Sequence, residues 1–249
     1  MLLLRSTLFF AWFAFVSVVL CILYLPTLVL PRRAIVAASR FWSRLVLFGL
    51  KWIAGLDYEV RGTPPGGGVL IAAKHMSMWD TVALYLLLDD PAVVLKRDLR
   101  LIPFYGWYTW KAGSIAIDRD GKASALRQMA ASAKKAMAEG RSILIFPEGT
   151  RKPPGAPPDY KPGVAGLYGQ LNAPCVPVAL NSALFWTGPG GFLKKRGRIV
   201  VQFLEPIPSG LRRREFMATL EERIERATDA LLAEGRVLLE RRETSLAIS

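Results

Sequence analysis

The chain opens with a long apolar stretch that contains no charged side chain. It covers residues 7–30 and is about as long as the roughly 20 residues that a helix needs to cross the hydrocarbon core of a bilayer. Pro26 is expected to end or kink this helix. Basic residues gather after the stretch rather than before it. Arg5 precedes it, and Arg32, Arg33, Arg40, Arg44 and Lys51 follow it. The positive-inside rule therefore predicts that the downstream domain lies on the cytoplasmic face of the membrane.

The next segment, residues 34–56, has a different pattern. Apolar and aromatic residues recur at helical spacing and are interleaved with basic ones, which predicts a helix in the membrane interface with its basic side chains toward lipid phosphates. An ordinary helix packed on a protein core is the alternative. Together the two segments can form a full span or a re-entrant hairpin in one leaflet. A cleaved signal peptide is disfavoured, because the apolar stretch is long and no small-residue cleavage site follows it.

Beyond residue 56, short apolar runs alternate with stretches of helical periodicity. Strands are expected at residues 58–61, 69–73, 92–95, 114–117, 142–146, 176–180 and 199–204. Helices are expected at residues 79–88, 123–138 and 211–239, with an aromatic-rich helix or loop at 103–111 and a Pro/Gly-rich loop at 152–162. This alternation predicts an α/β domain with a largely parallel sheet flanked by helices. The chain thus divides into N-terminal membrane-anchoring helices, residues 1–56, and an α/β domain with a C-terminal amphipathic helix, residues 57–249.

Charge adds a partner to this picture. The 249 residues include 33 Lys and Arg against 20 Asp and Glu, a formal net charge of +13. Such an excess favours an anionic partner, namely phospholipid, nucleic acid or an acidic carrier protein. The basic residues are scattered and form no nucleic-acid motif, which argues against nucleic acid. Local clusters can hold the domain on anionic lipid or dock an acidic carrier, with a solvated surface as the alternative. They are Lys194, Lys195, Arg196 and Arg198, and Arg212, Arg213 and Arg214.

Disulfide and metal chemistry find little support in the sequence. Cys21 lies in the apolar stretch and Cys175 beside an expected strand, far away along the chain. Both are predicted to be free thiols, so the protein should not depend on an oxidising compartment. One histidine and no cysteine cluster leave too few ligands for a metal hydrolase. The sequence therefore predicts no metal site.

The only histidine, His75, closely follows the apolar run of residues 69–73, and Asp80 comes five residues after it. On one continuous helix the two side chains would point well apart, since each residue turns by roughly 100°. They can meet if His75 lies in the turn after the strand and Asp80 in the first turn of the next helix, for which Ser77 is a suitable N-cap. His75 would then be a general base oriented by Asp80. The alternative is a capping box of Ser77 and Asp80, with His75 an ordinary loop residue.

Further charged residues follow other expected strands. Glu148 and Arg151 come just after one strand, and Arg119 just after another. Ligands of open α/β sheets bind at the carboxyl ends of the strands, so one crevice can collect these residues with His75. Guanidinium groups match phosphate in bidentate fashion, and Lys161 can add a third cation. Taken singly, each of these charged residues can equally be a solvated loop residue.

Four sequence blocks resemble the glycerolipid acyltransferases. The stretch His75-Met76-Ser77-Met78-Trp79-Asp80 matches their HxxxxD motif, and Phe146-Pro147-Glu148-Gly149-Thr150-Arg151 matches their FPEGTR motif. Residues 113–119 and 176–180 are similar to the second and fourth blocks, and the four occur in family order. HxxxxD alone has low specificity, whereas its combination with FPEGTR is highly specific. The FPEGTR form and the N-terminal apolar segment most resemble 1-acyl-sn-glycerol-3-phosphate acyltransferases. One departure is Ala116, where a bulkier apolar residue is usual.

The resemblance implies a membrane-bound enzyme of phospholipid biosynthesis, with its catalytic domain on the cytoplasmic face of the inner membrane. It would transfer a fatty acyl group from acyl-CoA or acyl-carrier protein to the 2-hydroxyl of lysophosphatidic acid, giving phosphatidic acid without a cofactor. His75 would remove the hydroxyl proton while Asp80 orients the ring, and no acyl-enzyme would form. The same chemistry on another lyso-phospholipid or a lyso-aminolipid is the alternative. A non-catalytic protein that binds anionic lipid would leave FPEGTR unexplained.

The resemblance also implies which residues contact the acceptor. Arg119, Glu148, Gly149 and Arg151 would lie at its glycerol-phosphate, with the two arginines on the phosphate. Glu148 would organise these arginines or bind polar groups of the acceptor, and Lys161 is an additional candidate for the phosphate.

Overall fold

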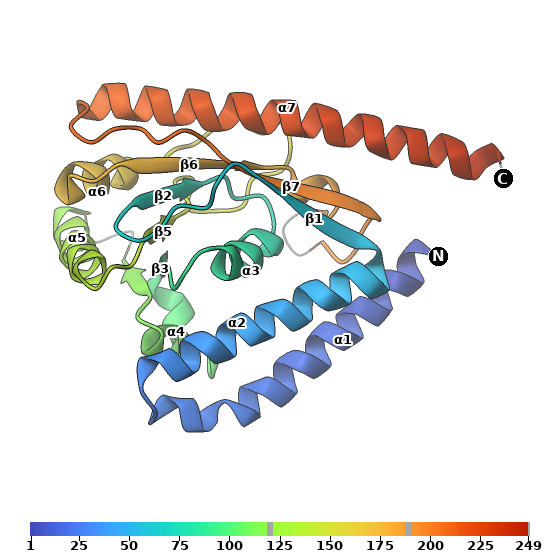
Figure 1. The fold of residues 1–249 in the computed structure, drawn as a ribbon, viewed down its shortest axis with the longest axis horizontal. Coiled ribbons are helices and arrows are strands. Elements are labelled where there is room, and N and C mark those ends of the chain that lie inside the picture. The colour runs from blue at the N-terminus through green and yellow to red at the C-terminus, as the bar shows by residue number, and fades with distance from the viewer. Residues whose placement is uncertain (119–121, 188–190, 249) are drawn as a thin grey trace.

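A seven-stranded sheet forms the centre of the protein, in the strand order β1-β7-β6-β2-β5-β3-β4 (Figure 1). The computed structural model describes residues 1–118, 122–187 and 191–248, with the backbone alone at 122–123 and 242–248. The strands are β1 (Leu56–Arg61), β2 (Leu70–Ala73), β3 (Ala92–Lys96), β4 (Ile115–Ile117), β5 (Ile143–Ile145), β6 (Cys175–Leu180) and β7 (Gly197–Phe203). Neighbouring strands are parallel except β6 and β7, which are antiparallel. The predicted fold class, a largely parallel sheet flanked by helices, is therefore confirmed.

The central strands are buried on both faces, as their continuous apolar runs predict. Alternate residues point to opposite faces, so Ile71 and Leu144 pack in one core cluster and Leu70 and Ile143 in another. The first cluster lies under the N-terminal helices and α3; the second lies under α5, α6 and the first half of α7. Figure 1 shows α7 along one side of the sheet and α1, α2 and α3 along the other. The helices are α1 (Leu2–Leu23), α2 (Arg32–Gly49), α3 (Met78–Leu87), α4 (Tyr105–Lys111), α5 (Lys122–Ala138), α6 (Gly163–Leu171) and α7 (Arg213–Ile248).

The first two helices form a hairpin, joined by the 3₁₀ turn η1 (Leu25–Leu28). The indole Nε1 of Trp12 donates to the carbonyl of Leu45 at 3.0 Å, which ties the two helices together. Gly49 permits this approach, since a Cβ at that position would lie 2.2 Å from the Trp12 ring. Helix α1 ends before Pro26, as predicted. Among the described residues it is the one helix long and apolar enough to cross a membrane.

Helix α2 differs from the expected interfacial helix in its basic residues. It ends at Gly49, and the chain continues through a π-helical turn, η2 (Leu50–Ala54), into β1. Three basic side chains of this region contact the α/β domain rather than projecting toward lipid. They are Arg32 to Asp90 (2.7 Å), Arg40 to the carbonyl of Leu88 (2.7 Å) and Lys51 to Asp57 (2.7 Å). The inner face of α2 therefore packs on protein, which was the alternative to an interfacial helix. The end of α3 and the start of β1 supply the oxygen atoms that accept its hydrogen bonds and ion pairs.

The helix α6 is absent from the prediction. It contains three glycines, which lower helix propensity. One of them, Gly166, allows α5 to pack closely, since a Cβ there would lie 2.6 Å from the Leu126 side chain. Helix α7 extends to Ile248, beyond the predicted end, and buries the predicted stripe that includes Phe216, Leu220 and Ile224. The two cysteines are free thiols, as predicted.

Candidate active site

The turn between β2 and α3 carries the His75–Asp80 pair. Ser77 has extended backbone and caps α3, its Oγ accepting the N–H of Trp79 at 3.2 Å. Asp80 therefore falls in the first helical turn, and its Oδ2 accepts from the N–H groups of Met76 (2.6 Å) and Ser77 (2.8 Å). The same oxygen lies 3.0 Å from Nδ1 of His75. The capping box and the His–Asp pair, posed as alternatives by the sequence, are thus both present and share one carboxylate.

The buried Asp80 carboxylate fixes the orientation of the imidazole. An ionised carboxylate only accepts hydrogen bonds, so Nδ1 of His75 is the donor and Nε2 carries the free lone pair. The other oxygen of Asp80 accepts from Ser182 Oγ at 2.5 Å. Phe146 stacks on the imidazole with ring centroids 4.0 Å apart. The imidazole of His75 is therefore held by a hydrogen bond at one edge and an aromatic ring on one face.

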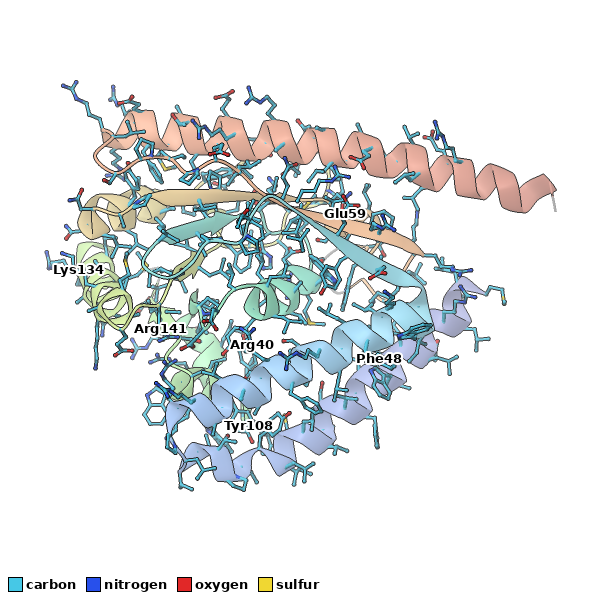
Figure 2. The ribbon with its side chains drawn as sticks, in the orientation of Figure 1. Arg40, Phe48, Glu59, Tyr108, Lys134 and Arg141 are labelled. Atoms are coloured by element: carbon cyan, nitrogen blue, oxygen red, sulfur yellow. The ribbon has the colours of Figure 1, made fainter. Side chains whose placement is uncertain are left out.

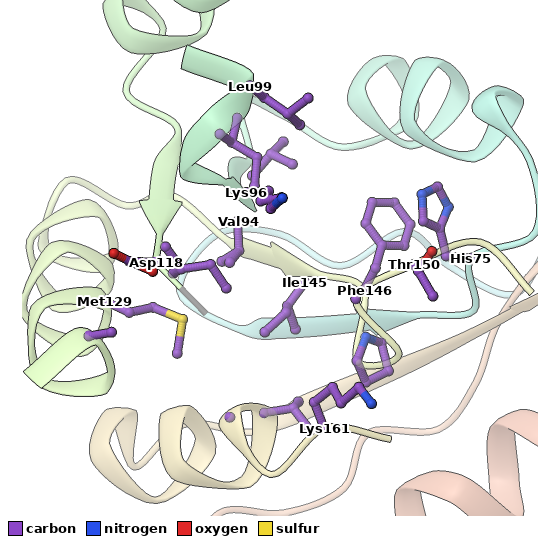
Figure 3. A pocket seen from close by; sticks show the side chains of 18 of the residues that line it. His75, Val94, Lys96, Leu99, Asp118, Met129, Ile145, Phe146, Thr150 and Lys161 are labelled. Atoms are coloured by element: carbon purple, nitrogen blue, oxygen red, sulfur yellow. The ribbon is translucent and has the colours of Figure 1, made fainter. Parts of the chain in front are cut away.

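A cavity of about 910 Å³ opens beside this histidine (Figure 3). His75, Thr150 and Arg151 line one part of it, and Lys161 reaches it from the segment before α6. Another part is apolar. It is lined by Val94, Ile117, Leu126, Met129 and Ile145. The cavity therefore places an imidazole, cations and an apolar section in one space at the carboxyl ends of β2, β3 and β5.

The FPEGTR turn is tied by its backbone to the histidine loop. Gly149 has a left-handed φ of 67°, which glycine adopts without strain, and its N–H donates to the carbonyl of Phe146 at 2.9 Å. The N–H of Lys152 donates to the carbonyl of His75, also at 2.9 Å. This pairing brings Arg151 to the cavity that His75 lines.

The structure describes all but one of the predicted site residues. His75, Gly149, Arg151 and Lys161 line the cavity, and Asp80 lies behind His75. Lys161 is exposed, and its Nζ pairs with Asp159 at 2.7 Å. In the described part of the chain, no carboxylate pairs with the Arg151 guanidinium, which remains available for an anion. Arg119, the second expected phosphate ligand, lies outside the described residues.

Glu148 forms an ion pair with a buried lysine. Glu148 is not among the residues that line the cavity. Its Oε1 accepts a hydrogen bond from Lys74 Nζ at 2.9 Å. Lys74 Nζ also donates to both oxygens of Glu225 on α7, at 2.7 and 3.0 Å. Tyr160 donates its hydroxyl to Glu225 at 2.7 Å. The described contacts thus place Glu148 in a buried ion cluster with Lys74 and Glu225.

Electrostatics in this cluster follow from burial. Burial raises the pKa of Glu148, and the ammonium of Lys74 opposes that rise. Oε2 of Glu148 is buried without a hydrogen-bond partner among the described residues. Burial and the hydrogen bond to Glu225 both raise the pKa of Tyr160. The Lys74 ammonium and the backbone N–H of His75 therefore both favour the charged form of Glu148, with Lys74 the larger influence.

Sequence reasoning missed Lys74, Glu225 and Ser182. A signal existed for Lys74, because a lysine that continues a buried apolar run needs a buried partner. Glu225 lies next to Ile224 of the apolar stripe of α7. An acidic residue beside a buried position also needs a partner, but this signal is weaker. For Ser182 we find no signal, since a serine after a strand is common.

Comparisons with known proteins bear on this site. The acyltransferase family model matches residues 57–181, which include the histidine, its aspartate and the FPEGTR turn. A 1-acyl-sn-glycerol-3-phosphate acyltransferase of Pseudomonas aeruginosa is 36% identical over 179 residues, covering 70% of this chain and 68% of that protein. The chain belongs to the acyltransferase family. The predicted resemblance and the predicted enzyme class are therefore confirmed.

Other acyltransferases are similar over the same region. The human 1-acyl-sn-glycerol-3-phosphate acyltransferase alpha is 30% identical over 175 residues, which are 67% of this chain and 60% of that one. The match thus spans less than two thirds of the human protein. The crystal structure of the 1-acyl-sn-glycerophosphate acyltransferase of Thermotoga maritima has a TM-score of 0.76, with 93% of this chain and 98% of that chain covered. At 22% identity this likeness supports the acyltransferase fold alone.

Proposed function

We propose that the chain transfers a fatty acyl group from a thioester to the 2-hydroxyl of 1-acyl-sn-glycerol-3-phosphate (lysophosphatidic acid), giving phosphatidic acid. One observation carries the proposal: His75, oriented by Asp80, lines a cavity that joins the cation of Arg151 to an apolar section. A lipid with a phosphate at one end and an acyl chain at the other matches both parts. The names of the relatives from Pseudomonas aeruginosa and human support this acceptor.

The proposed chemistry needs one base and no acyl-enzyme. Nε2 of His75 takes the proton of the acceptor hydroxyl as its oxygen attacks the thioester carbonyl. The C–S bond then breaks, and the imidazolium returns the proton to the leaving thiolate. Asp80 stabilises the imidazolium in between. A positioned general base of this kind contributes about 10²–10⁴-fold to the rate. The donor is acyl-CoA or acyl-carrier protein, and no cofactor takes part.

Phosphate binding is assigned to Arg151, with Arg119 and Lys161 as additional cations. Arg151 is supported by its position on the cavity wall and its lack of a carboxylate partner in the described chain. A guanidinium in such surroundings is a strong ligand for an anion.

Lys74 and Glu148 are assigned a positioning role. Lys74 immediately precedes His75, and Glu148 lies between Phe146, which stacks on the imidazole, and Arg151. Their ion pair therefore links the two loops that present the base and the phosphate ligand. Glu225 of α7 also binds Lys74, so the C-terminal helix helps to hold the histidine loop in place.

The N-terminal hairpin is proposed to anchor the enzyme in one leaflet rather than to span the membrane. Near the start of α1, Ser6 Oγ accepts the N–H of Lys194 at 2.9 Å, and Phe9 packs edge-on against Trp186. Near its end, the Tyr108 hydroxyl donates to the carbonyl of Cys21 (Figure 2). A 22-residue helix is about 33 Å long. Both ends contact the same α/β domain, so neither is free to lie on the far side of a bilayer.

The deciding experiment is an acyl-transfer assay on the full chain purified in detergent, with lysophosphatidic acid and an acyl-CoA. Wild type should form phosphatidic acid, and His75→Ala, checked for folding by circular dichroism, should lose most of the turnover. Acyl-carrier protein replaces acyl-CoA in a second series, and lyso-phospholipids and lyso-aminolipids replace the acceptor in a third. A folded His75→Ala enzyme with wild-type turnover would contradict the assignment of the base. Activity on a phosphate-free acceptor alone would contradict the acceptor.

A further inference from the structure

The segment from η3 (Arg97–Leu101) through α4 exposes an unusual set of apolar side chains. Five large side chains between residues 101 and 110 are exposed. They are Leu101 (84%), Ile102 (47%), Tyr105 (42%), Trp107 (46%) and Trp110 (60%). Single exposed apolar residues are normal on a soluble surface, but a contiguous group marks an interaction site. We name this group the aromatic patch.

The aromatic patch adjoins the N-terminal hairpin. The hydroxyl of Tyr108 reaches the end of α1, and Arg32 at the start of α2 donates to the carbonyl of Ala112 at 3.4 Å. Figure 1 shows α4 beside the bend between α1 and α2. Helix α1 exposes its own apolar side chains, among them Phe15 (65%). The patch and the outer face of α1 are therefore parts of one apolar side of the molecule.

The composition of the patch fits a bilayer surface. Tryptophan and tyrosine prefer the region of the lipid headgroups, and basic residues there contact anionic phosphates. Lys96 and Arg97 precede the patch with half or more of each side chain exposed, and Lys111 ends it. A protein partner of the same surface is not favoured, because the patch continues into a helix that is apolar enough to lie in lipid.

The cavity beside His75 extends to this patch, because Tyr105 belongs to both. Leu99 and Tyr105 line the cavity, while Leu101 and Ile102 between them face outward. In Figure 3, Leu99 lies at one end of the cavity and Lys161 at the other, with Phe146 and His75 between them and to one side. A chain molecule that leaves the bilayer at the patch thus meets the side chains of Leu99, Tyr105 and Phe146 on its way to His75.

The backbone of the patch is held in a strained conformation. Phe104 joins η3 to α4 with φ 61° and ψ −58°, a region that bulky residues avoid. Gly106 packs so closely that a Cβ would lie 2.0 Å from the carbonyl oxygen of Arg100. Such strain persists only where surrounding contacts fix it, and it is concentrated at functional segments.

We infer that the aromatic patch inserts into the lipid surface and is the portal through which the lipid acceptor enters the cavity. The identity of the acceptor rests on the function proposed above, whereas insertion of the patch does not. The acceptor then passes from membrane to active site without exposing its acyl chain to water. The polar mouth of the cavity beside Lys161 and Arg213 stays open to the aqueous phase and to a water-soluble donor.

Insertion is tested by a label at the patch. Leu101→Cys in a Cys21→Ser, Cys175→Ser background is labelled with an environment-sensitive fluorophore and mixed with phosphatidylglycerol vesicles that contain spin-labelled lipid. We expect strong quenching. Val237→Cys is the matched control, because Val237 is an exposed apolar residue (47%) on α7, on the other side of the sheet. Quenching at neither position, or equally at both, would overturn the insertion.

The portal is tested by kinetics. Leu101→Glu should raise the KM for long-chain lysophosphatidic acid presented in vesicles several-fold. It should not change the KM for a short-chain, water-soluble lysophosphatidic acid, and Val237→Glu should change neither. An equal loss on both acceptors would mean a damaged cavity and would overturn the portal. If the chain made no phosphatidic acid but residue 101 were still quenched, the proposed function alone would fail.

Discussion

Nζ of Lys74 lies 2.9 Å from Oε1 of Glu148, and both side chains are almost completely removed from solvent. The pair connects the residue before His75 to the middle of the FPEGTR turn. These two loops leave neighbouring strands, β2 and β5, whose register pairs Ala72 with Ile145. The pairing of the strands brings the loops close, and the ion pair fixes them against each other.

Replacing Lys74 with methionine should destabilise the fold strongly. The change leaves the Glu148 carboxylate buried without its cation, and breaking a buried pair in this way costs about 3–5 kcal/mol. Denaturant unfolding in detergent measures the loss. Lys161→Met, which removes an exposed pair with Asp159, is the control and should lower stability far less. Adding Glu148→Gln to Lys74→Met should recover part of the stability; no recovery would mean that the pair is not the cause.

His75→Ala and Ser77→Ala should separate catalysis from helix capping. His75→Ala should lower kcat by about 10²–10⁴-fold with little change in stability. Ser77→Ala removes the cap of α3 and should cost about 0.5–2 kcal/mol in unfolding free energy, with a smaller effect on kcat. Initial rates and thermal unfolding of both variants give the comparison. The opposite ranking would show that the histidine is structural and the serine catalytic.

Arg151→Ala should weaken acceptor binding. Hydrogen bonds to a charged group are worth about 1.5–3 kcal/mol, so the acceptor KM should rise about ten- to hundredfold. The donor KM should stay unchanged. Lys134→Ala is the control, because Lys134 lies on the outer side of α5, away from the cavity (Figure 2). If the KM for lysophosphatidic acid is the same in both variants, Arg151 does not bind the phosphate.

The buried Lys194 predicts a pH dependence of stability. Its Nζ donates to the carbonyls of Gly191 and Phe192 and lies 4.2 Å from the centre of the Trp186 ring. Burial lowers the pKa of Lys194 from 10.5 to about 8. Below about pH 8 both folded and unfolded chains hold the proton, so the full cost of burying the charge is present. Between about pH 8 and 10.5 the unfolded chain binds more protons, and stability rises with pH.

Lys194→Met removes this titration and provides the comparison. The difference in unfolding free energy between wild type and Lys194→Met should shift in favour of wild type as the pH rises from 8 to 10.5. Thermal unfolding across that range measures it, and other lysines and tyrosines cancel in the difference. Parallel stability curves would show that Lys194 is not buried as a charge.

The sequence predicted the turn between β2 and α3 and the helix α7, because capping and apolar periodicity depend on neighbouring residues. The Ser77 cap and the spacing of His75 and Asp80 predicted the turn of the active site, because a strand end and a helix start leave few arrangements for six residues. The apolar stripe of α7 was likewise readable from its periodicity. Helix α6 was missed because its glycines lower the helix propensity of the segment. The reason for Gly166, its close contact with Leu126 of α5, is visible only in the folded protein.

Long-range pairings were beyond the sequence. Glu225 contacts Lys74 across 151 residues, and no local pattern distinguishes it from the other acidic residues of α7. The antiparallel pairing of β6 with β7 is another case, since strand composition does not encode direction. Similarly, the exposed tryptophans of α4 resembled an ordinary aromatic helix, because exposure depends on what the rest of the chain leaves uncovered.

The contact between Lys74 and Glu225 also orders events during synthesis on the ribosome. At roughly 5–20 residues per second, α7 emerges on the order of 10 s after the histidine loop. The N-terminal hairpin can meet the bilayer during this interval, while Lys74 still lacks one of its two carboxylates. Helix α7 therefore completes the buried ion cluster last, because Glu225 follows Lys74, Glu148 and Tyr160 in the chain.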